Sequence, residues 1–301
     1  MLRCVPPTRD ALEAAHAFVP GDKPWQAELR LRQSLWRERL GVAPGLVRGR
    51  PLGSRLPAGD RTSNFLTPAA AAAVEAARAQ PGALVSAPRV YDNLLSSQPL
   101  AFNLFASVGA DPGLRSMVGN ALWPDLLHAT EAVLLEWSPG RGDPRFLANR
   151  SAFDVAFIGR DRGGKRTCVG VEVKYHEDMT QDPGAPDNSR YREVAAASGV
   201  FVDPDAASLR ARPLKQVWFD HLLALSMIGV TVDRAKFVLL APDANPAATA
   251  VDSLYRTHVM EATTYERRSL EEVAGVVRQA AGPGWPDHFT LRYLTPTAYG
   301  R

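Results

Sequence analysis

The sequence predicts an α/β fold in which a mixed β-sheet is flanked by helices. Three short apolar segments bounded by turn residues are typical of strands, namely residues 132–137, 153–158 and 167–175. Apolar residues at helical period follow over 214–228, and a further buried strand is predicted over 236–240. Strands and helices that alternate in this way favour a sheet covered by helices.

A change in the predicted secondary structure along the chain divides it into two parts. The length of 301 residues suits one large domain or one and a half smaller ones. Helical, linker-rich sequence gives way near residue 90 to alternating helices and strands. We therefore expect a helical N-terminal extension over residues 1–88 and an α/β domain over residues 89–301.

The other elements follow from apolar spacing and capping residues. Apolar side chains near helical spacing predict a helix over 25–40, and the Gly, Pro and Arg residues of 41–60 indicate a loop or tether. Thr67 is a favoured N-cap and Pro68 is tolerated at the first helical position, so a second helix begins there. Further helices are predicted over residues 94–105, 122–128 and 247–260, and from Ser269 onward. The remaining segments are predicted as a hairpin turn at 162–165, a loop at 177–190 and a last strand at 289–294.

Composition excludes several classes of protein. No apolar run reaches the length of roughly 18 residues that a membrane span needs, and the first residues lack the apolar core of a secretory signal. We therefore expect a cytoplasmic protein without a membrane partner. The two cysteines form no CxxC motif, which argues against structural zinc and against a disulfide scaffold. The net charge of +3 and pI of 9.0 suit a nucleic-acid partner. Arginine and alanine are abundant, as a GC-rich genome would produce, so charge supports this partner without establishing it.

The predicted strand over 167–175 carries two charges where burial is expected. Because side chains alternate along a strand, three valines share one face, and Glu172 and Lys174 project together from the other. Burying either charge alone is costly, so the pair must meet each other, a metal or a ligand. A structural ion pair at the end of the strand is the alternative interpretation.

The preceding predicted strand shows a similar anomaly. Phe153, Val155 and Phe157 are expected on one face, with Asp154 on the opposite face. The glycine-containing turn between the two strands makes them neighbours. Asp154 could then lie beside Glu172, although the sequence does not determine the register.

Two neighbouring carboxylates suit a hard divalent cation. Mg²⁺ prefers oxygen ligands and takes one or two carboxylates, waters and phosphate oxygens, and Mn²⁺ is expected to substitute for it. A lysine beside such a site can stabilise charge on a phosphate or orient an attacking water. Asp154, Glu172 and Lys174 therefore predict a site for phosphodiester hydrolysis.

These residues also carry a family resemblance. Asp154, followed on the next strand by Glu172-Val173-Lys174, resembles the PD-(D/E)xK nuclease superfamily, also called restriction-endonuclease-like. The flanking segments 93–105, 136–139 and 174–177 are similar to a group of bacterial PD-(D/E)xK nuclease-like proteins. The resemblance covers roughly residues 60–240.

The resemblance implies a fold and roles for particular residues. It implies an α-β-β-β-α-β core with Asp154 and Glu172 on the metal and Lys174 at the phosphate. The carbonyl of Val173 is implied as a further metal ligand.

The sequence departs from the family pattern in two places. Phe153 replaces the proline that precedes the metal-binding aspartate. No glutamate occurs between Glu75 and Glu131, so the first core helix lacks the glutamate that many members contribute. Gln98, Asn103 or Glu136 could take the place of that glutamate. Whether the site binds one metal ion or two remains open.

Three further side chains are weaker candidates for supporting roles. Gln216 opens the helix after the motif, where related nucleases often place a glutamine, although it could equally be an ordinary polar residue at a helix start. Glu177 could orient Lys174 or be solvated. Glu136, at the end of a strand, could support the metal or be a surface acid.

These inferences lead to two main functional hypotheses. The first is a Mg²⁺-dependent nuclease that hydrolyses phosphodiester bonds of nucleic acid, with DNA as the expected substrate. The alternative is a catalytically silent nuclease-fold module that binds nucleic acid or regulates, which the missing helix glutamate favours. Hydrolysis of another phosphate ester is a third hypothesis, because a fold does not determine a substrate.

Overall fold

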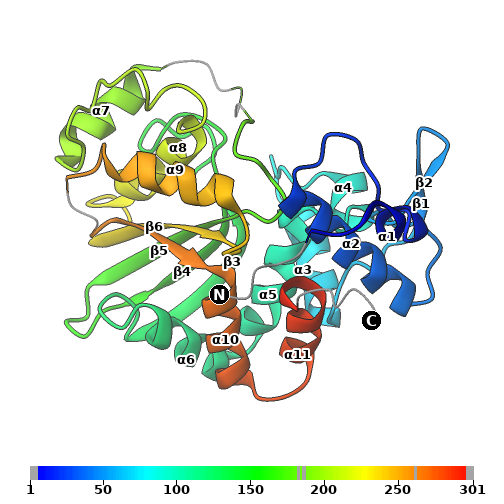
Figure 1. Cartoon of the computed structure of the whole chain (residues 1–301). Helices are drawn as coiled ribbons and strands as arrows, with labels where there is room; N and C mark the ends of the chain where they lie inside the picture. Colours follow the sequence, from blue (N-terminus) through cyan, green and yellow to red (C-terminus); the bar gives the residue numbers. More distant parts are fainter. Residues whose placement is uncertain (1–5, 182–183, 185–187, 261–262, 296–301) are drawn as a thin grey trace.

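A five-stranded mixed sheet lies at the centre of the fold (Figure 1). The computed structural model describes residues 6–181, 184, 188–260 and 263–295. The strands, in their spatial order, are β3 (Ala129–Trp137), β4 (Phe153–Arg160), β5 (Arg166–Val173), β6 (Arg234–Ala241) and β7 (Tyr265–Ser269). β3, β4 and β5 pair antiparallel, and β5, β6 and β7 pair parallel. The predicted fold class is confirmed, and β7 is a strand that the sequence patterns did not reveal.

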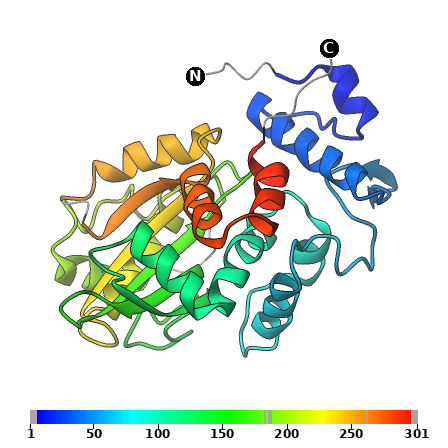
Figure 2. The ribbon, with the colours of Figure 1, turned by 90° about the horizontal axis from the view of Figure 1, so that it is seen from below.

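Helices cover both faces of the sheet (Figures 1 and 2). One face packs against α5 (Ser97–Ala110), α6 (Pro112–Leu122) and α10 (Leu270–Ala281). The other face packs against α7 (Ser189–Ser198), α8 (Lys215–Met227) and α9 (Pro246–Arg256). Parallel neighbours need a crossover, and the connection from β5 to β6 contains α7 and α8, while that from β6 to β7 contains α9. No helix within the described ranges is both long and apolar enough to cross a membrane.

The valines of β5 belong to the core between the sheet and α5. Val169, Val171 and Val173 are each at most 1% exposed and pack in one hydrophobic cluster, as their alternation predicts. Cys168 packs on the opposite face with α8. Both faces of β5 are therefore buried, as is usual for a central strand.

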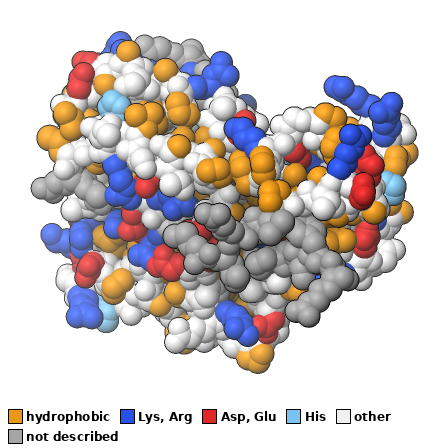
Figure 3. Space-filling view, in the orientation of Figure 1, with side chains coloured by type: hydrophobic (Ala, Val, Ile, Leu, Met, Phe, Trp, Pro, Cys, Tyr) orange, Lys and Arg blue, Asp and Glu red, His pale blue; other side chains and the backbone are white. Residues whose placement is uncertain are grey.

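The N-terminal part is helical and packs against both the sheet helices and the C-terminal helices. Its elements are α1 (Arg9–Ala14), α2 (Pro24–Arg39), the hairpin β1 (Gly45–Val47) and β2 (Arg50–Leu52), α3 (Pro68–Arg78) and α4 (Ala87–Asp92). The Thr67 side chain caps α3 by accepting a hydrogen bond from Ala70 N, as predicted. α3 packs on α5, across the expected boundary at residue 88. In Figure 3 the outline of the molecule has a notch between the N-terminal part and the part that contains the five-stranded sheet.

Two predicted elements were wrong. Residues 122–128, predicted as a helix, form a turn after α6, because Trp123 precedes a proline and adopts a non-helical backbone. Residues 289–294, predicted as a strand, end α11 (Trp285–Phe289) and form a π-helical turn (Thr290–Leu294). Here Phe289 and Tyr293 both point into the core, so packing at a helical spacing overrides the strand-like composition.

Two predicted loops contain regular structure at their ends. The segment 41–60 holds the short β1–β2 hairpin. The segment 177–190 runs into α7, which begins at Ser189, and its residues 182–183 and 185–187 lie outside the described part of the chain.

Candidate active site

The register of β4 and β5 sets Asp154 opposite Glu172. The last paired residues are Val155 and Val171, and one further step along both strands reaches the two acids. The strands separate there, and the Asp154 carboxylate accepts a hydrogen bond from Val173 N at 2.8 Å. Both acidic side chains line one cavity.

Phe153 packs on the face of the sheet that carries Glu172. The prediction that it shares the face of Val155 and Phe157 was wrong, because its ring lies over Gly170. A Cβ atom added at Gly170 would lie 2.4 Å from Phe153 Cε1. Glycine at this position therefore leaves the space that the ring fills beside Asp154.

Lys174 lies between two oxygen acceptors. Its Nζ donates to Glu172 Oε1 at 2.7 Å and to Gln216 Oε1 at 3.0 Å. Gln216, in the first turn of α8, also donates from Nε2 to Glu172 Oε1 at 2.6 Å. Lys174 and Glu172 are each 7% exposed. Burial alone would lower the pKa of Lys174, but the carboxylates of Glu172 and Glu177 raise it above its usual value, so the ammonium stays charged.

Burial and neighbouring carboxylates raise the pKa of Asp154 and Glu136 in this cavity. Burial, followed by the charges of Glu172 and Glu136, raises the pKa of Asp154 well above its usual value. Burial and the charge of Glu172 likewise raise the pKa of Glu136. Lys174 acts to lower the pKa of Asp154, and Arg141 and Arg89 act to lower that of Glu136, but burial and the like charges outweigh them. A cation bound here would favour the charged form of both acids.

Gln98 and Glu136 meet at the wall of the cavity, whereas Asn103 lies elsewhere. Gln98 Nε2, in the first turn of α5, donates to Glu136 Oε2 at 3.1 Å. Glu136, near the end of β3, has a left-handed backbone with φ of 51°. Asn103 instead bonds to Asn64 O and to Tyr293 Oη in the interior, away from the cavity.

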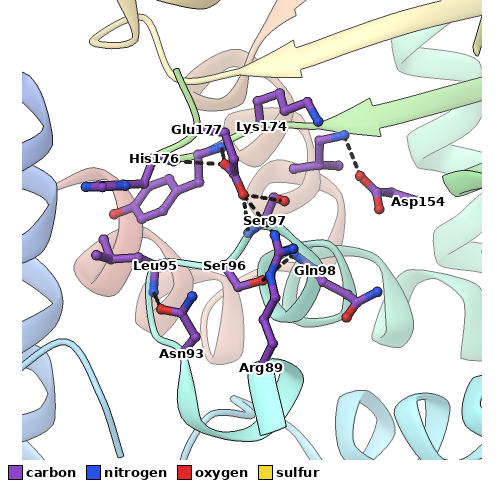
Figure 4. Close-up of polar contacts among 12 residues, drawn as sticks. Arg89, Asn93, Leu95, Ser96, Ser97, Gln98, Asp154, Lys174, His176 and Glu177 are labelled. Carbon is purple, nitrogen blue, oxygen red and sulfur yellow. Dashed lines mark hydrogen bonds and ion pairs between the residues drawn. The ribbon is translucent and has the colours of Figure 1, made fainter. Parts of the chain in front are cut away.

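Glu177 ties the end of β5 to the start of α5 (Figure 4). Its carboxylate accepts from Tyr175 N at 2.8 Å, from Ser97 Oγ at 2.8 Å and from Arg89 Nη2 at 3.3 Å. Although burial acts to raise the pKa of Glu177, the charge of Lys174 and these hydrogen bonds lower it. Glu177 is therefore a charged, well-bonded side chain rather than a solvated one.

Sequence reasoning missed Asp220, a further acid in the same cavity. This cavity has a volume of about 310 Å³. Asp220 lies on α8 one helical turn after Gln216 and is 4% exposed. Burial, followed by the charge of Glu172, raises the pKa of Asp220 well above its usual value. The signal in the sequence was a lone acid in an apolar helix, four residues after Gln216.

The oxygen atoms of this site fit a hydrated divalent cation. Within the described ranges, no three His, Cys, Asp or Glu side chains lie close enough to hold an ion on their own. Mg²⁺ needs only one or two carboxylates, with waters and carbonyls. Both hydrogen bonds to Glu172 reach Oε1, so Oε2 accepts none from the described residues. The N–H of Val173 points to Asp154, and its carbonyl faces the same way, because both groups of a strand residue point to one side.

Comparison with known proteins identifies the family. A family model described as the PD-(D/E)XK nuclease superfamily matches residues 20–295 of the 301 residues. No curated protein and no solved structure matches the chain. The family match spans the sheet, the cavity and most of the N-terminal helices, and it points to a nuclease-type function on nucleic acid. The chain belongs to the PD-(D/E)XK nuclease superfamily.

Proposed function

We propose that this protein hydrolyses DNA phosphodiester bonds with Mg²⁺ at the cavity that holds Asp154, Glu172 and Lys174. One observation carries the proposal. Two carboxylates lie across from each other at the point where β4 and β5 separate, with a buried ammonium beside them. A sheet that is otherwise built for burial would not keep these charges without a ligand.

Each residue has a role that follows from its contacts. Asp154, Glu172 and the carbonyl of Val173 would hold the cation. Mg²⁺ bound at this position would supply a water of lowered pKa and would neutralise charge on the phosphate. Lys174 uses two N–H groups on Glu172 and Gln216, which leaves the third for a phosphate oxygen or for the attacking water.

Arginines beside the cavity support a nucleic-acid substrate. Arg89 and Arg150 line the cavity itself. A neighbouring cavity of about 430 Å³ shares Arg89 and adds Arg30 and Arg55. Guanidinium groups are suited to the phosphates of a nucleic-acid strand. DNA is the substrate that the restriction-endonuclease-like motif implies, and RNA is the comparison to test.

A cleavage assay on defined substrates tests the proposal. Linear, circular and single-stranded DNA and an RNA of the same sequence are incubated with the protein, with and without Mg²⁺. We expect cleavage of DNA that requires Mg²⁺. Asp154→Asn and Lys174→Ala should each lower the rate by roughly 10³-fold, about 4 kcal/mol in the barrier, because they remove a cation ligand and the phosphate contact.

Two matched variants control for charge. Asp205→Asn and Lys165→Ala change exposed residues outside the cavity and should retain the rate of the unmodified protein. Undiminished cleavage in Asp154→Asn or Lys174→Ala would contradict the assignment.

The second candidate is a silent nuclease-fold module that binds nucleic acid without cutting it. Gln98, rather than a glutamate, reaches the cavity from α5, and this observation favours it. Under this hypothesis the protein binds labelled DNA but yields no product at any Mg²⁺ or Mn²⁺ concentration.

A further inference from the structure

The β1–β2 hairpin holds two exposed arginines in a fixed position. Val47 pairs directly with Arg50, so Arg48 and Gly49 form a two-residue turn. Both turn residues have a positive φ, 52° for Arg48 and 77° for Gly49, as the tight turns favoured in hairpins require. Arg48 and Arg50, which we call the hairpin arginines, are both exposed.

The base of the hairpin is anchored in the N-terminal part. Arg37, on α2, is 3% exposed and donates to Val42 O at 2.6 Å and to Gly53 O at 3.0 Å, one on each side of the hairpin. A Cβ atom added at Gly53 would lie 2.2 Å from Ala15 O, so the chain packs closely against the end of α1. The hairpin therefore projects from a fixed base, on the side of the N-terminal part away from the sheet (Figures 1 and 2).

A row of adjoining cavities connects the active-site cavity to the hairpin. The active-site cavity and the neighbouring cavity of about 430 Å³ share Arg89 and Glu177. That second cavity shares Arg55 with a third one of about 460 Å³, which Leu46 and Val47 of β1 also line. A nucleic-acid strand that leaves the active-site cavity along this row would pass the hairpin.

The hairpin arginines carry positive charge that no carboxylate compensates. Within the part of the chain that the structure describes, neither guanidinium group has a hydrogen bond or an ion pair. By contrast, three arginines that line the second cavity each pair with a carboxylate; they are Arg30 with Asp22, Arg55 with Asp92 and Arg89 with Glu177. Guanidinium groups are suited to phosphates, so the hairpin end of the row complements a phosphate backbone.

Other features of the hairpin fit a nucleic-acid duplex better than a protein partner. Pro51 lies in the edge strand β2 and has no N–H, which disfavours regular pairing of a further strand with β2. Leu46 is 70% exposed and lies close in sequence to the hairpin arginines. Apolar side chains beside arginine are common in proteins that bind the minor groove of DNA.

We propose that the β1–β2 hairpin binds the phosphate backbone of duplex DNA beside the cut, through Arg48 and Arg50. This inference rests on the proposed function and deepens it, because it gives the N-terminal part a contact with the substrate outside the active-site cavity. Each arginine neutralises one phosphate and releases condensed counterions. The hairpin therefore contributes affinity and orients the duplex, and it takes no part in bond cleavage.

The salt dependence of DNA binding by the full chain tests this inference. Fluorescence anisotropy of a short labelled DNA duplex, in EDTA, gives the association constant K over a range of salt concentrations. In the double variant Arg48→Gln/Arg50→Gln we expect the slope of log K against log salt to become shallower by about 1.8, which is about 0.9 for each lost phosphate contact.

A matched double variant controls for loss of surface charge. Arg162→Gln/Lys165→Gln removes two exposed cations from the β4–β5 turn, outside all three cavities, and should keep the slope of the unmodified protein. Both double variants should keep the melting temperature of the unmodified protein, because all four side chains are exposed.

The outcomes separate this inference from the proposed function. A slope that is unchanged in Arg48→Gln/Arg50→Gln, or that falls equally in both double variants, overturns the inference and leaves the proposed function intact. An unchanged slope together with lost binding to phosphatidylserine vesicles would assign the hairpin to a membrane surface and likewise overturn it. The expected fall in slope, in a protein that does not cleave DNA with Mg²⁺, would support the hairpin contact and contradict the proposed function instead.

Discussion

Two buried polar clusters in this protein differ in how well their atoms are paired. The first, the anchor cluster, consists of Gln33, Asn64, Asn103 and Arg292, each fully buried. The Arg292 guanidinium donates to Gln33 Oε1 at 3.0 Å, to Asn64 O at 2.9 Å and to Asn64 Oδ1 at 2.6 Å. Asn103 donates to the same Asn64 carbonyl at 2.9 Å. Neutral oxygens thus hold a buried cation and join α2 to the C-terminal helices.

The second, the cavity cluster, consists of Glu136, Asp154, Glu172, Lys174 and Asp220. Burial and the charge of Glu172 raise the pKa of three of its acids, Glu136, Asp154 and Asp220. Asp220 Oδ2 has no partner among the described residues. The comparison teaches that polar burial alone does not identify a functional site. An unpaired buried carboxylate and neighbouring like charges favour a ligand-binding role for a buried polar cluster, whereas fully paired groups favour a structural role.

The largest effect on stability is expected in the anchor cluster. Arg292→Met should lower the free energy of unfolding by about 3–5 kcal/mol, because it leaves the oxygens of Gln33 and Asn64 buried and unpaired. Urea unfolding measures this loss, and Arg162→Met, at an exposed position, is the control. Asp154→Asn, in the cavity cluster, should cause no such loss. A loss below about 1 kcal/mol for Arg292→Met would contradict the role of the anchor cluster.

A smaller effect on stability is expected from the protonation of His221, which follows Asp220 in α8. Its ring bonds to Tyr255 Oη and Thr264 Oγ1, each at 3.0 Å, and burial lowers the pKa of His221 from 6.5 to about 3. Because this pKa is lowered in the folded state, the unfolded chain binds a proton first as the pH falls. The stability contributed by neutral His221 is present above about pH 6.5 and is lost progressively toward about pH 3, with about 2 kcal/mol lost at pH 5.

Urea unfolding at pH 7.5 and at pH 5 measures this loss. The free energy of unfolding at pH 7.5 minus that at pH 5 should be about 2 kcal/mol smaller in His221→Gln than in the unmodified protein. Asp220→Asn should instead make this difference in the free energy of unfolding larger. The raised pKa of Asp220 gives stability that is present below its unfolded pKa of 3.8 and is lost as the pH rises through the folded value. Equal pH dependence in the unmodified protein and His221→Gln would show that the imidazole is not held neutral.

The smallest effect is expected from Gln216, which links α8 to the cavity cluster. Gln216→Ala removes one acceptor from Lys174 and one donor from Glu172. We expect kcat for DNA cleavage to fall about tenfold, equivalent to about 1.4 kcal/mol, because Lys174 keeps Glu172 as a partner. Gln80→Ala, at an exposed position, is the control. A fall of less than about twofold would mean that Gln216 does not position Lys174.

Local patterns predicted the parts of the site that lie on adjacent strands. The alternation in β5 placed Glu172 and Lys174 opposite the valines, and the short turn made β4 its neighbour. Residues whose position depends on packing between distant segments were not predictable in this way. Asp220 reaches the cavity only because α8 crosses over the sheet, and Asn103 faces Asn64 and Tyr293 rather than the cavity. Phe153 lies on the opposite face from the one predicted, because Gly170 on the next strand leaves room for its ring.

The sequence by itself determined the mixed α/β fold and the three ionisable residues of the superfamily motif. It could do so because strand alternation is a local property of the backbone, and because a charge in an apolar strand is costly wherever the strand lies. Only the tertiary structure decided that Asp154 lies across from Glu172, that Asp220 joins them, and that residues 289–294 are helical. Register, helix crossing and burial depend on contacts between residues far apart in the chain, and no local pattern specifies those contacts.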